Sequence, residues 1–157
     1  MRWLLFFGLG LGIHGCQGYE RARECARIAQ VTNTALASIR NLDSADENAP
    51  SSEVYGTISE RYDQLEKELG EIEKQLIDRE LTRSLATLRT SLRVAAREAQ
   101  QYGASLLELQ SLQQQDNAQA KLVRARKRLT RGRDRMQKNL QSYQAARERI
   151  DRSCAIR

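Results

Sequence analysis

The chain has 157 residues, with 26 lysines and arginines against 20 acidic residues and a formal net charge of +6. The length suits one domain, and a single proline among many helix-forming residues favours an all-helical protein. The only histidine is His14, so the chain after it has none for a catalytic triad, a general base or a metal site. No phosphate-binding loop, metal-ligand spacing or nucleophile elbow occurs, and we expect neither catalysis nor a cofactor.

The chain begins with the organisation of an export signal. Arg2 supplies a positive charge, and the apolar run that follows, residues 3–13, is eleven residues long. A membrane-spanning helix needs about 20 apolar residues, so this run fits the hydrophobic region of a signal peptide. It ends in Ile13-His14-Gly15-Cys16, which resembles the lipobox of bacterial lipoproteins, although His14 departs from the small or hydroxyl residue preferred there. The alternative is a buried N-terminal helix with an incidental cysteine.

The resemblance implies a processing scheme and a location. In that family the motif cysteine receives a diacylglycerol, the peptide is cut before it, and the new amine is usually acylated. Residues 1–15 would then be the cleaved signal, Cys16 the lipidation site and its membrane anchor, 16–18 a tether, and 19–157 the helical domain. The family's sorting rule retains proteins with aspartate after the cysteine at the inner membrane. Gln17 therefore implies the outer membrane, facing the periplasm.

Two cysteines remain once Cys16 carries lipid. Disulfides persist in exported proteins, so Cys25 and Cys154 are predicted to pair. Two separate thiols are the alternative.

Hydrophobic periodicity predicts four helices. The first spans about 19–42, and the second starts after Ser51 or Ser52 and runs to Leu76. A turn near 77–79, with Asp78 as cap, separates it from a third helix ending at Gln113. A single helix from Ser52 to Gln113 is the alternative. The fourth spans about 117–153, with Asp116 as cap.

The apolar residues of these helices recur at spacings of three and four, which is typical of coiled-coil seams. The first helix presents Cys25, Ile28, Ala29, Thr32, Ala35, Leu36, Ile39 and Leu42. The fourth presents Ala118, Leu122, Ala125, Leu129, Gly132, Met136, Leu140, Tyr143, Ile150 and Cys154, with Arg147 on the same line. The carboxylates lie on helical surfaces beside lysine and arginine, where pairing within one helix explains them.

Short connections predict an antiparallel up-down four-helix bundle. The third and fourth helices are longer than the first two, so their hairpin should protrude. In this topology the first helix begins where the fourth ends, which brings Cys25 and Cys154 together.

A basic flank of the fourth helix is the most asymmetric feature of the chain. It is a candidate site for an anion or a partner and consists of Lys121, Arg124, Lys127, Arg128, Arg131, Arg135 and Lys138. It lacks interleaved aromatic residues, and an exported lipoprotein rarely meets nucleic acid, so we expect no nucleic-acid binding. The alternative is a solvated face balanced by the acidic second helix.

Two function classes follow. The first is a lipid-anchored envelope protein with a structural or interaction role, whose helical hairpin and basic flank engage a protein partner in the envelope. The second is a periplasmic carrier or chaperone that holds a lipid or apolar segment between its helices.

Overall fold

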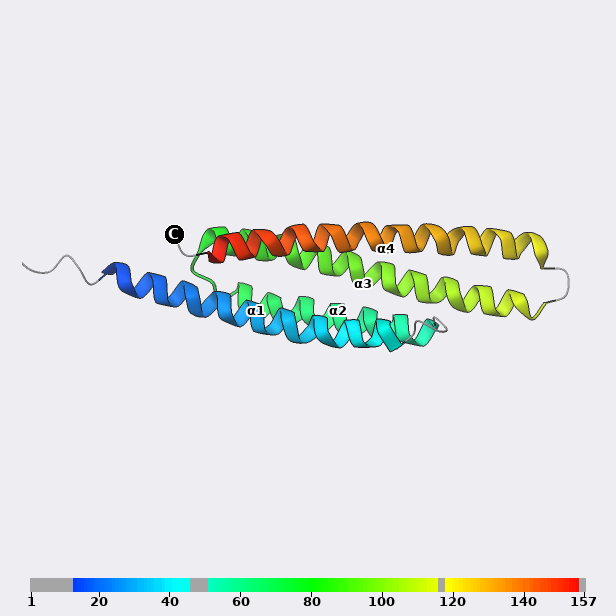
Figure 1. Cartoon of the computed structure of the whole chain (residues 1–157), viewed down its shortest axis with the longest axis horizontal. Helices are drawn as coiled ribbons and strands as arrows, with labels where there is room; N and C mark the ends of the chain where they lie inside the picture. Colours follow the sequence, from blue (N-terminus) through cyan, green and yellow to red (C-terminus); the bar gives the residue numbers. More distant parts are fainter. Residues whose placement is uncertain (1–12, 46–50, 116–117, 156–157) are drawn as a thin grey trace, which may run out of the picture.

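The computed structural model describes residues 13–45, 51–115 and 118–155. These residues form four helices and no strand: α1 (Ile13–Ala45), α2 (Ser52–Glu73), α3 (Arg79–Gln113) and α4 (Gln119–Cys154). Each helix packs on the next one along the chain, and the helices alternate in direction (Figure 1). The predicted all-helical up-down bundle is confirmed.

Helix α1 is longer than predicted at both ends. It begins at Ile13 and ends at Ala45, whereas the sequence placed it at about 19–42. No proline interrupts residues 13–45, so nothing in the backbone chemistry stops the helix there. The backbone is therefore helical through the predicted cleavage position and tether. The side chain of Cys16 lies outside the described part of the chain.

The break between α2 and α3 is confirmed, and one continuous helix is excluded. Helix α2 ends at Glu73, three residues before the predicted end at Leu76, and Asp78 caps α3. The Asp78 Oδ1 atom accepts hydrogen bonds from the backbone N–H groups of Glu80 at 2.8 Å and Leu81 at 2.9 Å. At the start of α2, the Ser51 hydroxyl accepts a bond from the Val54 N–H at 3.2 Å, so Ser51 is the cap.

The predicted cap of α4 is wrong. Helix α4 begins at Gln119, and Ala118 occupies the N-cap position without a side-chain hydrogen bond. Asp116 itself lies outside the described residues. Ala118 is buried in an apolar cluster with Leu112 and Ala125, so packing against α3 positions this end of the helix.

Helix α3 carries the centre of the core because it packs on both α2 and α4. Four of its leucines have no exposed surface: Leu81, Leu85, Leu88 and Leu92. They pack with apolar residues of the other three helices, including Ile28, Leu65, Leu69, Ile72, Tyr143 and Ile150. The predicted seam therefore forms the core over this stretch.

Two residues placed in the apolar stripes are not in the core. Ala29 is exposed, and Leu140 keeps 51% of its surface. The physical reason is that α1 packs mainly on α2 and meets α4 over only a short stretch, so α4 lacks a neighbour on part of its apolar stripe.

The α3–α4 hairpin protrudes as predicted (Figure 1). The first residue of α2 lies against Gly103, where an added Cβ atom would come 3.0 Å from the backbone oxygen of Ser52. Beyond this point α3 continues with α4 but without α2. We call residues 104–115 and 118–131 the distal arm; its interior contains Leu109, Leu112, Ala118, Leu122 and Ala125.

Candidate functional site

The disulfide closes one end of the bundle. Cys25 of α1 and Cys154 of α4 are bonded, with their Cα atoms 5.8 Å apart and a sequence separation of 129. The pairing predicted from topology is confirmed in the structure. The bond holds the N-terminal part of α1 beside the C-terminal end of α4.

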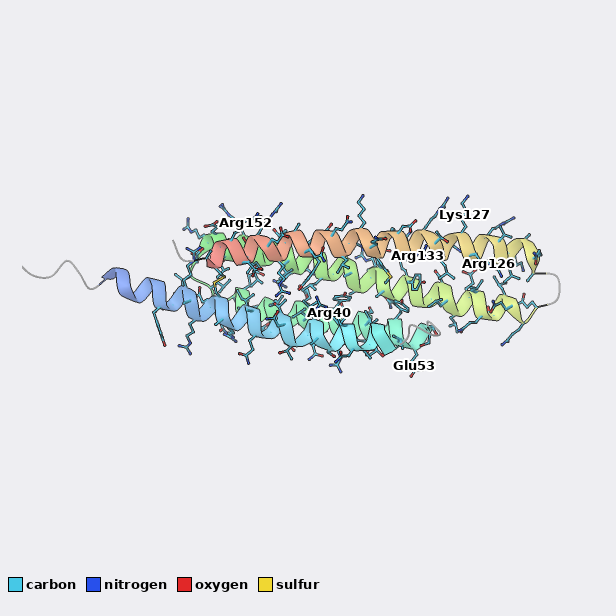
Figure 2. All side chains as sticks on the ribbon, in the orientation of Figure 1. Arg40, Glu53, Arg126, Lys127, Arg133 and Arg152 are labelled. Carbon is cyan, nitrogen blue, oxygen red and sulfur yellow. A yellow bond between two sulfur atoms is a disulfide. The ribbon has the colours of Figure 1, made fainter. Side chains whose placement is uncertain are left out.

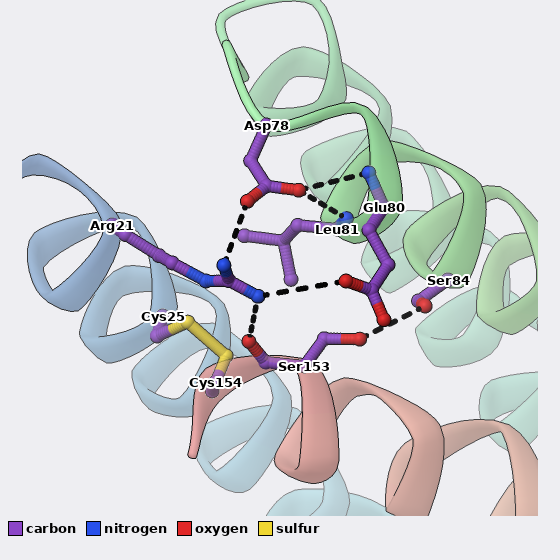
Figure 3. Close-up of a disulfide and its surroundings, with 8 residues drawn as sticks. All are labelled: Arg21, Cys25, Asp78, Glu80, Leu81, Ser84, Ser153 and Cys154. Atoms are coloured by element: carbon purple, nitrogen blue, oxygen red, sulfur yellow. Dashed lines mark hydrogen bonds and ion pairs between the residues drawn. A yellow bond between two sulfur atoms is a disulfide. The ribbon is translucent and has the colours of Figure 1, made fainter. Parts of the chain in front are cut away.

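Arg21 makes further contacts between helices at this end of the bundle (Figure 3). Its guanidinium lies 3.1 Å from the Asp78 carboxylate and 3.9 Å from that of Glu80, and it donates to the backbone carbonyl of Ser153. One side chain of α1 thus joins the α2–α3 turn to the last turn of α4. Sequence reasoning missed this role because Arg21 and its partners come from three separate segments of the chain.

The structure brings the seven predicted basic residues together along α4, and all seven are exposed. Arg128 pairs with Glu108 of α3, and Arg135 pairs with Glu98 of α3 at 2.7 Å. For the other five, no salt bridge is formed with any residue the structure describes. The acidic helix α2 does not pack on α4, so it does not balance this flank by direct contact.

Two clefts flank α1. One, of about 270 Å³, lies between α1 and α4 and has apolar walls that include Ile28, Leu88 and Ile150. The other, of about 340 Å³, lies between α1 and α2 and includes the charged residues Arg61 and Glu68. Both are near the lower end of the volumes usual for ligand pockets.

Two buried hydroxyls near the first cleft have no hydrogen-bond partner among the residues that the structure describes. The Thr32 hydroxyl lies in the cleft wall, and the Tyr143 hydroxyl lies in the adjoining core. Burial raises the pKa of Tyr143 to about 12, so this phenol stays neutral at physiological pH. The sequence marked both positions as apolar stripe but gave no sign that their hydroxyls would be unsatisfied.

The described residues form neither a membrane-spanning helix nor a metal site. No described helix is both long and apolar enough to cross a bilayer. Within the same ranges, no three histidine, cysteine or acidic side chains gather where they could hold a metal ion.

No protein family, curated protein or solved structure matches this chain.

Proposed function

We propose that this chain is a lipid-anchored protein of the bacterial envelope, held at the outer membrane, with a structural or interaction role. The observation that carries the proposal is the distal arm. It extends beyond α1 and α2 (Figure 1). Five of the seven exposed cations of the basic flank lie on it. The proposal includes no catalytic step.

The anchor rests on the first sixteen residues of the sequence. The charge of Arg2, the short apolar run and the motif ending in Cys16 support export and lipidation. The disulfide between Cys25 and Cys154 fits an exported protein, because disulfides persist outside the reducing cytosol. Two or more acyl chains on Cys16 would give stable membrane attachment, whereas one chain gives only marginal binding.

The arm is suited to reach a partner. Helix α4 has 36 residues, which corresponds to a length of about 54 Å. Because the arm is only two helices thick, both of its outer faces are open to a partner that the bundle itself would not touch. The disulfide end, where α1 begins, is the end that the anchor would hold near the membrane.

The anchor is tested by mass spectrometry of the protein purified from membranes. We expect an acylated Cys16 at the N-terminus. An intact Met1 terminus, or a free Cys16 thiol after cleavage elsewhere, would contradict the anchor.

The interaction role is tested by crosslinking in intact envelopes with a shortened arm. Removal of residues 106–112 and 123–129 takes one heptad from each helix, so the seam keeps its register. The Arg128–Glu108 pair shows that these stretches face each other. We expect the shortened protein to keep its disulfide and to lose the crosslinked partners of the full chain. Unchanged partners would contradict a role for the arm.

A carrier role is the second candidate, and the cleft between α1 and α4 is the observation in its favour. Its apolar walls and the unpartnered Thr32 hydroxyl could contact a small amphipathic molecule. Saturable binding of a fluorescent fatty acid that survives shortening of the arm would favour this role over the first.

A further inference from the structure

Six cations of α4 form a regular row. They are three, four, three, four and three residues apart, and they are Lys121, Arg124, Arg128, Arg131, Arg135 and Lys138. We call them the cationic row. At 1.5 Å per residue, successive members are about 5 Å apart along the helix and the row is about 25 Å long.

The period of the row equals that of the apolar seam. A repeat of 3.5 residues keeps a side chain at a constant position relative to a supercoiled partner helix. The cationic row therefore runs parallel to the α3–α4 seam instead of winding around α4. The contacts of the row with α3 are consistent with this parallel course. Arg128 and Arg135, which are seven residues apart, both pair with glutamates of α3, namely Glu108 and Glu98.

Most of the positive charge of the row is available to a ligand. Lys121, Arg124, Arg131 and Lys138 form no salt bridge with the residues that the structure describes. In the two ion pairs that do form, the side chains of Arg128 and Arg135 are each about half exposed. Exposed ion pairs contribute little to stability, so a polyanion could replace the carboxylates of α3.

The chemistry beside the row does not fit a protein partner. Protein interfaces bind through aromatic and apolar anchors at their centres. The large exposed apolar residues of the arm are Leu107 and Val123. Val123 lies about 100° from Arg124 around α4, and Leu107 lies about 100° from Glu108 around α3, so neither is on the row.

The row also faces away from the helix that would carry the anchor. Arg147 marks the side of α4 toward α1, because it donates to the Asn33 side chain at 2.8 Å. Arg135 and Lys138, the row members nearest Arg147 in sequence, lie about 120° and 180° from it around α4. In Figure 2, Lys127, which flanks the row, points away from the other helices, whereas Arg126 and Arg133 lie at the opposite edge of α4. To lay the row on the anchoring bilayer, the molecule would have to hold α1 on its far side.

We propose that the cationic row binds an elongated anionic glycan that carries carboxylates along its length. This proposal identifies the class of partner for the proposed interaction role, and it therefore rests on that role. A flexible, hydrated polyanion can follow a straight row on the side of a narrow arm and requires no apolar anchor. Binding is electrostatic, so each lysine or arginine contact displaces counterions and makes the affinity depend on salt. Nucleic acid is a poorer match, because no aromatic side chain lies on the row to stack with bases.

The test measures binding of the full chain, purified in non-ionic detergent, to immobilised polygalacturonate over a range of salt concentrations. The row variant is Arg124→Gln with Arg131→Gln. The matched control is Arg126→Gln with Arg133→Gln, which removes the same charge from the other side of the same helix. All four arginines are exposed, so both variants should keep the helical circular dichroism of the parent.

We expect the row variant to bind polygalacturonate about tenfold more weakly, and the control to change the affinity less than twofold. The slope of log affinity against log salt should become shallower by about one to two for the row variant alone. Equal losses in both variants would show that only net charge matters and would overturn the proposal.

Two further probes decide between partner classes. Vesicles of phosphatidylglycerol and phosphatidylcholine, and duplex DNA, replace polygalacturonate in the same assay. If the row variant loses more affinity for either of these than for polygalacturonate, the glycan assignment is wrong. A chain without lipid on Cys16 would contradict the proposed anchor but leave glycan binding by the row intact, so the two failures can be told apart.

Discussion

At the scale of single residues, Glu66 is the most consequential charge. It is buried on α2, with 9% of its surface exposed, and its Oε1 atom accepts hydrogen bonds from Arg89 and Arg93 of α3. Arg89 also pairs with Glu73, and Gly70 leaves room for its guanidinium. The sequence predicted that carboxylates would pair within their own helices. This is wrong here, because the pairs join α2 to α3.

Burial and pairing act on Glu66 in opposite directions. Burial alone would raise the pKa of Glu66, but the hydrogen bonds from Arg93 and Arg89 outweigh it and hold the pKa below its ordinary value. The hydrogen bond to Glu73 raises the pKa of Arg89 against the effect of burial. A carboxylate with a lowered folded pKa stabilises the fold above its unfolded pKa, which is about 4.3, and this stabilisation is lost as the pH falls through the folded pKa.

We predict that Glu66→Gln lowers the free energy of unfolding by about 1–3 kcal/mol at neutral pH, because the oxygen shared by the two arginines loses its negative charge. The difference from the parent should shrink as the pH falls below about 4.3. Urea unfolding at pH 7 and in acid measures both effects. The control is Glu60→Gln, an exposed position on the same helix. A gap that persists unchanged in acid, or a control as destabilised as Glu66→Gln, contradicts the prediction.

At the scale of helices, the α2–α3 turn depends on Asp78. Asp78 caps α3 by accepting hydrogen bonds from two backbone N–H groups, and it also forms an ion pair with Arg21. These are separable contributions, because asparagine can cap a helix but cannot form the ion pair.

We predict that Asp78→Ala destabilises the protein by about 1–2 kcal/mol, and that Asp78→Asn loses less. The reason is that alanine removes both contributions, whereas asparagine keeps the oxygen that accepts from the start of α3. Chemical denaturation of the two variants measures the difference. Equal losses would mean that capping contributes nothing at this turn.

At the scale of the whole molecule, the disulfide compensates for sparse packing between α1 and α4. These helices meet over only a short stretch, and the bond between Cys25 and Cys154 lies within it. The chain-entropy account gives roughly 4–5 kcal/mol for a loop of this size, usually as an upper figure.

We predict that Cys25→Ala with Cys154→Ala lowers the unfolding free energy by up to about 4 kcal/mol and loosens α1 first. Hydrogen exchange should rise in the N-terminal half of α1 more than in α3, because α3 is packed on two sides. The parent in dithiothreitol provides a second measurement with the same expected pattern. A uniform rise in exchange along all four helices contradicts a local role for the bond.

The orientation on the membrane is also a property of the whole molecule. Cys16 lies within α1, nine residues before Cys25, so the proposed anchor would hold the disulfide end near the bilayer. Arg21 is engaged by Asp78 and Glu80, so attraction to anionic lipid at this end depends on the exposed Arg23, Arg27, Arg149 and Arg152.

We predict that a spin label at Arg152 is quenched by lipid more strongly than one at Gln114, near the tip of the arm. Both positions are exposed, so the labels should not disturb the packing. Quenching in the reverse order would show that the arm lies on the membrane.

The helices, the α2–α3 break and the pairing of Cys25 with Cys154 could be predicted from the sequence alone. Helical periodicity and caps act over three or four residues, and the up-down topology then determines which ends meet. The exposure of the basic flank followed from the same periodicity, since its residues lie off the apolar stripe. Only the tertiary structure decided three features: the exposure of Leu140, the burial of Glu66, and the ion pairs and hydrogen bond of Arg21. They depend on how closely separate helices approach one another, and no local pattern encodes that distance.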